Sequence, residues 1–126
     1  MKKIIFTDKA PSPIGPYNQA VLIGNTLYTS GQIALNPSTM ELVLDTIEKE
    51  TTQVMENLKA VLEAADMNFS NVVKSTIYIS DMNDFAKINT VYASYFDEEI
   101  APARETVQVA NLPRNVNIEI SMIGIK

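Results

Sequence analysis

The arrangement of apolar and polar residues predicts six short strands in this chain. Apolar, β-branched and aromatic residues concentrate in segments of strand length, which we place at 2–6, 18–23, 26–29, 72–80, 104–110 and 116–125. Gly24-Asn25 separates the second and third segments and is a two-residue hairpin signal with glycine first. Three prolines between residues 10 and 16 exclude a helix or a central strand there and predict a stiff loop.

Two longer segments repeat their apolar residues at the spacing of an α-helix. The first runs over 46–65, with Asp45 as the expected N-cap and Glu48 three residues later as in a capping box. The second follows Asp81 and runs to about Phe96, with a stripe of large apolar and aromatic residues on one side. The predicted order is therefore βββαβαββ, an α+β fold with a mixed sheet.

Two helices with one apolar stripe each can cover only one face of such a sheet. In the last predicted strand, one side is apolar throughout: Val116, Ile118, Ile120 and Met122. The other side mixes polar and apolar residues: Asn117, Glu119, Ser121, Ile123 and Ile125. A mixed face of this kind is typical of a surface that meets a partner. We expect a homo-oligomer with polar pockets between subunits; the alternative is a monomer with an ordinary hydrated face.

Composition narrows the possible chemistry. The length of 126 residues suits a single domain over 1–126. The chain has no cysteine and no histidine, which excludes thiol nucleophiles, histidine general bases and the usual zinc ligands. The net charge of −5 disfavours nucleic acid as a partner. No apolar run is long enough for a membrane span or an export signal, so we expect a cytoplasmic protein without a membrane partner.

Several segments together resemble the RidA (YjgF) family of enamine and imine deaminases. They are 14–20, 30–33, 101–109, 112–113 and 118–120, with the sequences IGPYNQA, SGQI, APARETVQV, LP and IEI. Each motif is weak alone, but their order and spacing over almost the whole chain are specific. Two positions depart from the family pattern, since Asn18 replaces a commoner serine and Glu105 a commoner small residue.

The resemblance implies a fold like that of AroH-type chorismate mutase, with three subunits packing their sheets into a barrel and sites at the interfaces. It also implies a reaction in which 2-iminopropanoate or 2-iminobutanoate, formed from enamines such as 2-aminoacrylate, is hydrolysed to a 2-oxo acid and ammonia. The substrate is already activated, so no metal and no organic cofactor is expected.

Arg104 and Glu119 are the candidate catalytic residues. The guanidinium of Arg104 suits bidentate binding of the substrate's α-carboxylate; the alternative is a weak surface ion pair with Glu105. Glu119 lies between two apolar strand residues, an unfavourable place for a carboxylate unless it has a task. In the family this position orients water or moves a proton; the alternative is a hydrated strand residue.

Five further residues are candidates for binding the substrate: Tyr17, Ser30, Gly31, Asn89 and Thr106. Tyr17 could give a wall and a hydroxyl, or simply anchor its loop. Gly31 could allow close approach of the backbone, or only shape a bulge. Thr106 shares a strand face with Arg104 and could present its backbone amide, and Glu105 should point to the other face. Asn89 matches a recurring family asparagine and has a structural role as its alternative.

Three other functions remain open from the sequence. The first is a non-catalytic regulator that binds 2-oxo acids on the same fold. The second is action on RNA, which has been attributed to family members but cannot use histidine here. The third is a holdase-like binding protein.

Overall fold

The computed structural model describes all residues from Met1 to Lys126. Its strands are β1 (Lys2–Ile5), β2 (Ala20–Ile23), β3 (Thr26–Thr29), β4 (Val72–Ile79), β5 (Ala103–Gln108) and β6 (Ile118–Ile125), and its helices are α1 (Ile47–Ala64) and α2 (Phe85–Ala93). Four short 3₁₀ turns lie between them: η1 (Phe69–Asn71), η2 (Met82–Asp84), η3 (Glu98–Ile100) and η4 (Pro113–Asn115). The predicted order βββαβαββ is confirmed, although α2 ends three residues before the predicted end at Phe96.

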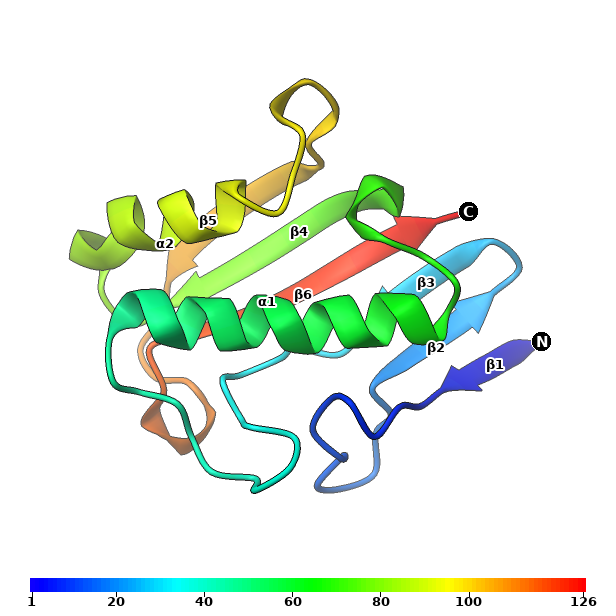
Figure 1. The fold of residues 1–126 in the computed structure, drawn as a ribbon, viewed down its shortest axis with the longest axis horizontal. Coiled ribbons are helices and arrows are strands. Elements are labelled where there is room, and N and C mark those ends of the chain that lie inside the picture. The colour runs from blue at the N-terminus through cyan, green and yellow to red at the C-terminus, as the bar shows by residue number, and fades with distance from the viewer.

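All six strands form one mixed sheet in the order β1-β2-β3-β6-β4-β5 (Figure 1). Every neighbouring pair is antiparallel except β4 and β5, which are parallel. The C-terminal strand β6 therefore lies in the middle of the sheet, and β5 forms one edge. Gly24 has a φ of 57° in the β2–β3 hairpin, which agrees with the glycine-first turn expected there.

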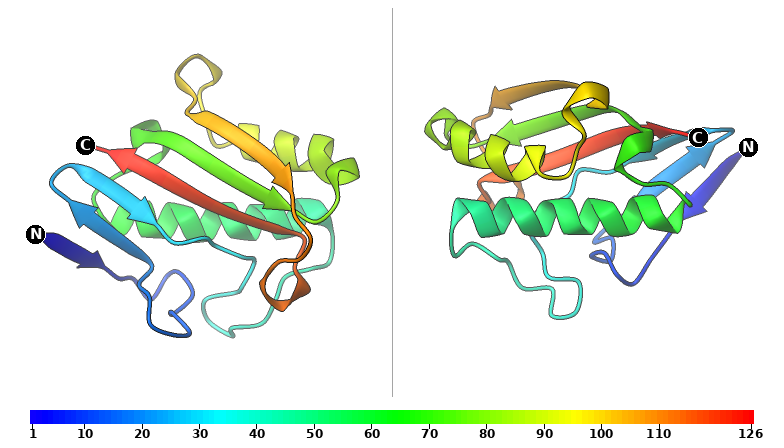
Figure 2. Two further views of the ribbon diagram at one scale, coloured as in Figure 1. Left: turned by 180° about the vertical axis from the view of Figure 1, so that it is seen from behind. Right: turned by 45° about the horizontal axis from the view of Figure 1, so that its top comes forward.

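Both helices pack against the same face of the sheet and leave the opposite face open (Figure 2). The core lies between helices and sheet and includes Leu27, Leu58, Leu62, Ile77, Ile79, Ile118 and Ile120, all essentially without exposed surface. Each such side chain stabilises the fold by about 1.5–3 kcal/mol relative to leaving it exposed. No helix is both long enough and apolar enough to span a membrane.

Two local predictions are wrong. The N-cap of α1 is Thr46 rather than Asp45, because the Thr46 hydroxyl accepts a hydrogen bond from the Lys49 backbone N–H at 3.1 Å. In β4, regular alternation over 72–80 predicts Val73 on the same side as Ser75, Ile77 and Ile79, but an irregularity between Val72 and Lys74 leaves Val72 buried and Val73 exposed.

The open face of the sheet has the mixed character that the sequence predicts. Glu119, Ser121 and Ile123 alternate with buried residues along β6 and are half-buried. The strand register places Ile4, Val21, Tyr28 and Ile123 in one row across this face. This row is a large apolar stripe on a face that no element of the chain covers.

Candidate functional site

Arg104 is held at the edge of the sheet by residues of α2. Its Nη1 donates a hydrogen bond to Oδ1 of Asn89 at 2.7 Å. Its guanidinium carbon lies 5.1 Å from the centre of the Tyr92 ring and 5.6 Å from that of Phe85. These contacts orient the cation without neutralising it, because none of the three partners is an anion. A cavity of about 610 Å³ adjoins Arg104, Asn89 and Tyr92.

Tyr92 is itself held in place by a hydrogen bond to the sheet. Its hydroxyl donates a hydrogen bond to Oγ of the fully buried Ser75 at 2.8 Å. Burial raises the pKa of Tyr92 above its ordinary value, and this effect outweighs the lowering by Ser75 and by the charge of Arg104. The ring is therefore a neutral, rigid support for the guanidinium.

Glu119 lies on the open face of the sheet, in β6, and is half-buried. Its side chain makes no hydrogen bond or ion pair, and burial raises the pKa of its carboxyl group. The carboxyl group packs directly on Gly31: a Cβ added to that glycine would lie only 1.9 Å from Oε2 of Glu119. The absence of a side chain at Gly31 thus lets the Glu119 carboxyl group lie close to the backbone there.

Glu119 adjoins a second cavity, of about 560 Å³, which also contains Tyr17, Ser30 and Gly31. The Tyr17 hydroxyl accepts a hydrogen bond from the Ile14 backbone N–H at 3.2 Å, which leaves its own proton free to donate. The Ser30 hydroxyl donates to the backbone carbonyl of Asn18, so its proton is already used. Four of the seven predicted site residues thus share one cavity.

Thr106 lines neither cavity. Its hydroxyl oxygen is buried without a hydrogen-bond partner, so this oxygen is enclosed by its own subunit. The backbone N–H of Thr106, in contrast, is not enclosed by its own subunit. Val109 N–H bonds to the Ile79 carbonyl, and in a parallel ladder only alternate residues bond to the neighbouring strand. The backbone N–H groups of Arg104 and Thr106 therefore face the free edge of β5.

The predicted site residues form two groups on opposite faces of the sheet. Arg104 pairs in register with the buried Ser75 and lies on the helix side. Glu119 pairs with Tyr78 and lies on the open side, with β4 between the two strands. Arg104 and Asn89 are thus separated, within one chain, from Glu119, Tyr17, Ser30 and Gly31.

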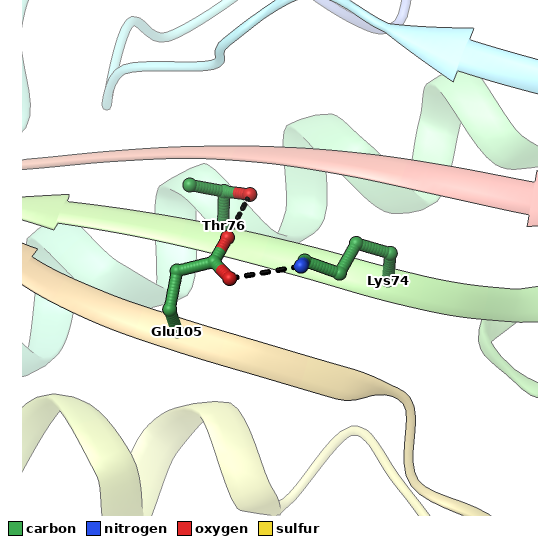
Figure 3. A network of polar contacts seen from close by, with 3 residues as sticks. All are labelled: Lys74, Thr76 and Glu105. Atoms are coloured by element: carbon green, nitrogen blue, oxygen red, sulfur yellow. Dashed lines mark hydrogen bonds and ion pairs between the residues drawn. The ribbon is translucent and has the colours of Figure 1, made fainter.

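Glu105 points away from Arg104, as the strand alternation predicts. Its carboxylate forms an ion pair with Lys74 Nζ at 2.8 Å and accepts a hydrogen bond from the Thr76 hydroxyl at 2.7 Å (Figure 3). The bond from Lys74, followed by that from Thr76, lowers the pKa of Glu105. This network lies on the open face, so the alternative of an Arg104–Glu105 ion pair is excluded.

Reasoning from the sequence did not identify the aromatic support of Arg104 or the turn beside Glu119. Phe85 and Tyr92 are seven residues apart and fit the apolar stripe of a helix, which masked their contact with Arg104. Pro113 and Arg114 line the Glu119 cavity, and Arg114 has a φ of 56°, in the left-handed region. A left-handed backbone at a non-glycine residue is uncommon and marks this turn as unusual, but it cannot be seen in the sequence. The structure contains no cluster of three acidic residues that could hold a metal ion.

Comparisons with known proteins agree on the family and the fold of this chain. Residues 7–126 match the family model described as endoribonuclease L-PSP. A RutC family protein of Pyrococcus horikoshii is 53% identical over all of this chain and 99% of its own length. The 2-iminobutanoate/2-iminopropanoate deaminase of mouse is 45% identical over all of this chain and 93% of its own length. The crystal structure of E. coli TdcF with bound serine superposes with a TM-score of 0.92, at 44% identity and 98% coverage of both chains.

Proposed function

Because the chain belongs to the endoribonuclease L-PSP family, which includes the RidA and YjgF proteins, we propose that it hydrolyses reactive 2-imino acids. The substrates are 2-iminobutanoate and 2-iminopropanoate, and the products are the 2-oxo acids and ammonia. The observation that carries the proposal is Arg104, a cation that is held on an aromatic support beside a cavity and forms no ion pair, although Glu98 also lines that cavity. Such a group suits an anionic ligand.

Arg104 binds the α-carboxylate of the substrate in this proposal. A guanidinium offers two parallel N–H donors to a carboxylate, and the free backbone N–H of Thr106 adds a third donor from the same edge. Asn89 keeps the guanidinium in place from the side of α2. Fixing the carboxylate orients the imine carbon and reduces the entropic part of the barrier.

Glu119 performs the proton transfers. Its carboxylate accepts a proton from a water molecule as the water oxygen bonds to the C=N carbon of the iminium ion. Glu119 then returns this proton to the nitrogen. As the C–N bond breaks and ammonia leaves, the Glu119 carboxylate accepts the hydroxyl proton of the intermediate, so that the carbonyl forms, and this proton passes to the ammonia to give ammonium. The raised pKa of Glu119 suits both steps near neutral pH. Tyr17 can donate its free hydroxyl proton to the bound substrate.

One subunit cannot bring these groups together, because Arg104 and Glu119 lie on opposite faces of its sheet. We therefore infer that the site forms between copies, with Arg104 from one subunit and Glu119 from the next. The exposed apolar stripe on the open face favours a homo-oligomer, and the family resemblance implies that this oligomer is a trimer. Each interface of a cyclic trimer would contain one complete site.

A coupled assay tests the reaction. Threonine dehydratase generates 2-iminobutanoate in place, and semicarbazide traps the imine that escapes hydrolysis. We expect the wild type to suppress trapping catalytically and Arg104→Ala to lose at least about 100-fold in kcat/KM. Lys87→Ala, which removes an exposed cation from α2, is the matched control and should behave as the wild type. Retention of kcat/KM within twofold by Arg104→Ala would exclude the carboxylate clamp.

Mixing two inactive variants tests the shared site. Arg104→Ala and Glu119→Gln are unfolded together in equal amounts and refolded into mixed oligomers. If each site takes Arg104 from one chain and Glu119 from another, about a quarter of the sites contain both intact residues. Recovery of about a quarter of wild-type activity supports the shared site. No recovery in oligomers shown to be mixed would contradict it.

A binding protein on the same fold is the second candidate function. The serine in TdcF favours it, since that relative binds an amino acid with an α-carboxylate and no turnover is implied. This candidate predicts saturable binding of 2-oxobutanoate that depends on Arg104, without suppression of imine trapping by the wild type.

A further inference from the structure

Glu50 is a buried carboxyl group that the proposed reaction does not use. It lies near the start of α1 and has no exposed surface. Its Oε2 accepts a hydrogen bond from the backbone N–H of Asn117 at 2.8 Å, and its Oε1 accepts one from Nδ2 of Asn117 at 2.7 Å. A carboxyl group away from water is costly unless such bonds replace its hydration. The bonds to Asn117 are therefore strongly favoured.

Asn117 is the junction between three elements. Besides its bonds to α1, its carbonyl accepts a hydrogen bond from the Ser80 backbone N–H at 3.0 Å, and its Oδ1 accepts one from the Ser80 hydroxyl at 3.2 Å. Ser80 directly follows β4, and Asn117 directly precedes β6. Glu50 thus ties the beginning of β6 and the end of β4 to the N-terminal part of α1.

The same junction ends the turn that borders the Glu119 cavity. Arg114 and Asn115, in η4, have φ values of 56° and 57°, and Pro113 and Arg114 line the cavity. Consecutive left-handed residues persist only where the surroundings fix them. Asn117 comes two residues after this turn and two residues before Glu119. Any loosening at Asn117 therefore reaches both the wall of the cavity and its carboxyl group.

We propose that Glu50 is a positioning residue for the Glu119 cavity. Through Asn117 it holds the exit of η4 and the start of β6, so that the Glu119 carboxyl group stays packed on Gly31 and shielded from water. This role deepens the proposed imine hydrolysis and rests on it for its catalytic consequence. Its structural part, the placement of Glu119, can be measured without any substrate.

The titration of Glu119 reports that placement. Burial raises the pKa of Glu119, so a carboxyl group released from Gly31 into water should titrate at a lower pH. Within one subunit, the titratable or charged side chains around Glu119 are Tyr17 and Arg114, which share its cavity, and Tyr78, its register neighbour in β4; in the proposed shared site, Arg104 of the next subunit also faces it. A substitution at position 50 or 117 replaces none of these side chains.

The experiment compares four variants with the wild type: Glu50→Ala, Glu50→Gln, Asn117→Ala and the double variant with alanine at both positions. Proteins labelled with ¹³C in glutamate side chains are titrated by NMR, and Glu119→Gln identifies the signal. Glu48→Gln, at an exposed position of the same helix, is the matched control. Asn117→Ala leaves every charge in place, so it separates a lost hydrogen bond from a lost charge.

We expect Glu50→Ala and Asn117→Ala to lower the titration midpoint of Glu119 by about half a pH unit or more. Glu50→Gln keeps an acceptor for the backbone N–H, so the titration midpoint of Glu119 in this variant should stay close to that of the wild type. The double variant should match Glu50→Ala, because both changes break one link. In the coupled imine assay, the two alanine variants should lose about tenfold in kcat/KM.

The proposal is overturned if the alanine variants melt at a lower temperature while Glu119 titrates as in the wild type, since Glu50 would then only stabilise the fold. It is also overturned if Asn117→Ala has no effect and both Glu50 variants act equally, which would indicate a direct charge effect. If the midpoint shifts as expected but the wild type hydrolyses no imine, the positioning role stands and the proposed reaction fails.

Discussion

Gly31→Ala should displace the carboxyl group of Glu119 while leaving the fold intact. The new Cβ would lie 1.9 Å from Oε2, 2.7 Å from Cδ and 3.0 Å from Cγ of Glu119. Ordinary van der Waals contact begins near 3.4 Å, so the carboxyl oxygen must move by about 1.5 Å. The backbone at Gly31 is not in the left-handed region, and alanine brings no backbone strain there.

The size of the expected effect follows from this displacement. A misplacement of about 1 Å in a reacting group can lower the rate about 100-fold, so we expect kcat/KM for 2-iminobutanoate to fall by about that factor. The Glu119 side chain can rotate away from the new methyl group. The free energy of unfolding should therefore change by less than about 1 kcal/mol.

The coupled semicarbazide assay measures the first quantity and urea denaturation the second. Gly24→Ala is a control for which we expect the reverse pattern. Its Cβ would meet nothing within 4 Å, but its φ of 57° strains alanine, so it should lose about 1 kcal/mol of stability and keep its activity. A Gly31→Ala variant with kcat/KM within threefold of the wild type would refute the reasoning, because the carboxyl group would then not need its place on Gly31.

Three further outcomes follow from the structure. Burial raises the pKa of Glu119, so the stability that its protonated form contributes is present below the ordinary pKa and lost as the pH rises through the folded-state pKa. In urea denaturation, the free energy of unfolding of Glu119→Gln minus that of the wild type should therefore be larger at pH 8 than at pH 4. An equal difference at both pH values would contradict this. Asn89→Ala removes the acceptor of Arg104 and should lower kcat/KM about tenfold, mainly through KM; unchanged steady-state kinetics would show that the aromatic rings suffice. Tyr92→Phe leaves the buried Ser75 hydroxyl unpaired and should lower the free energy of unfolding by about 1–3 kcal/mol; a loss under about 0.5 kcal/mol would count against that bond.

The strands and helices could be predicted because their signals are local. The alternation in β6 separates a buried side from a mixed one with no knowledge of the rest of the chain. The boundaries depend on contacts that are not local. Tyr95 and Phe96 continue the helical stripe, yet their rings pack on Phe69 with centroids 5.3 Å away in each case, beyond the end of α2. Periodicity identifies such residues as buried but cannot say in which element.

The candidate site residues could be chosen from the sequence, but their grouping could not. Gly31 and Glu119 are far apart in sequence, and their contact depends on β6 lying beside β3, a property of strand order. The support of Arg104 by Phe85 and Tyr92 depends on where α2 crosses the edge of the sheet. Strand order and helix placement arise from packing of the whole chain, so local patterns do not encode them.

The separation of Arg104 from Glu119 has a chemical consequence for the proposed reaction. If both groups faced one cavity in the same subunit, the guanidinium would pair with the carboxylate, and the pair would lower the pKa of Glu119 and occupy the donors that the substrate needs. On opposite faces of one subunit, Arg104 forms no ion pair with Glu119, and burial raises the pKa of Glu119. A substrate carboxylate placed between two subunits would then neutralise Arg104 before the cation could act on Glu119. A site divided between copies can in this way keep a strong anion binder and a weakly acidic proton carrier a few ångströms apart.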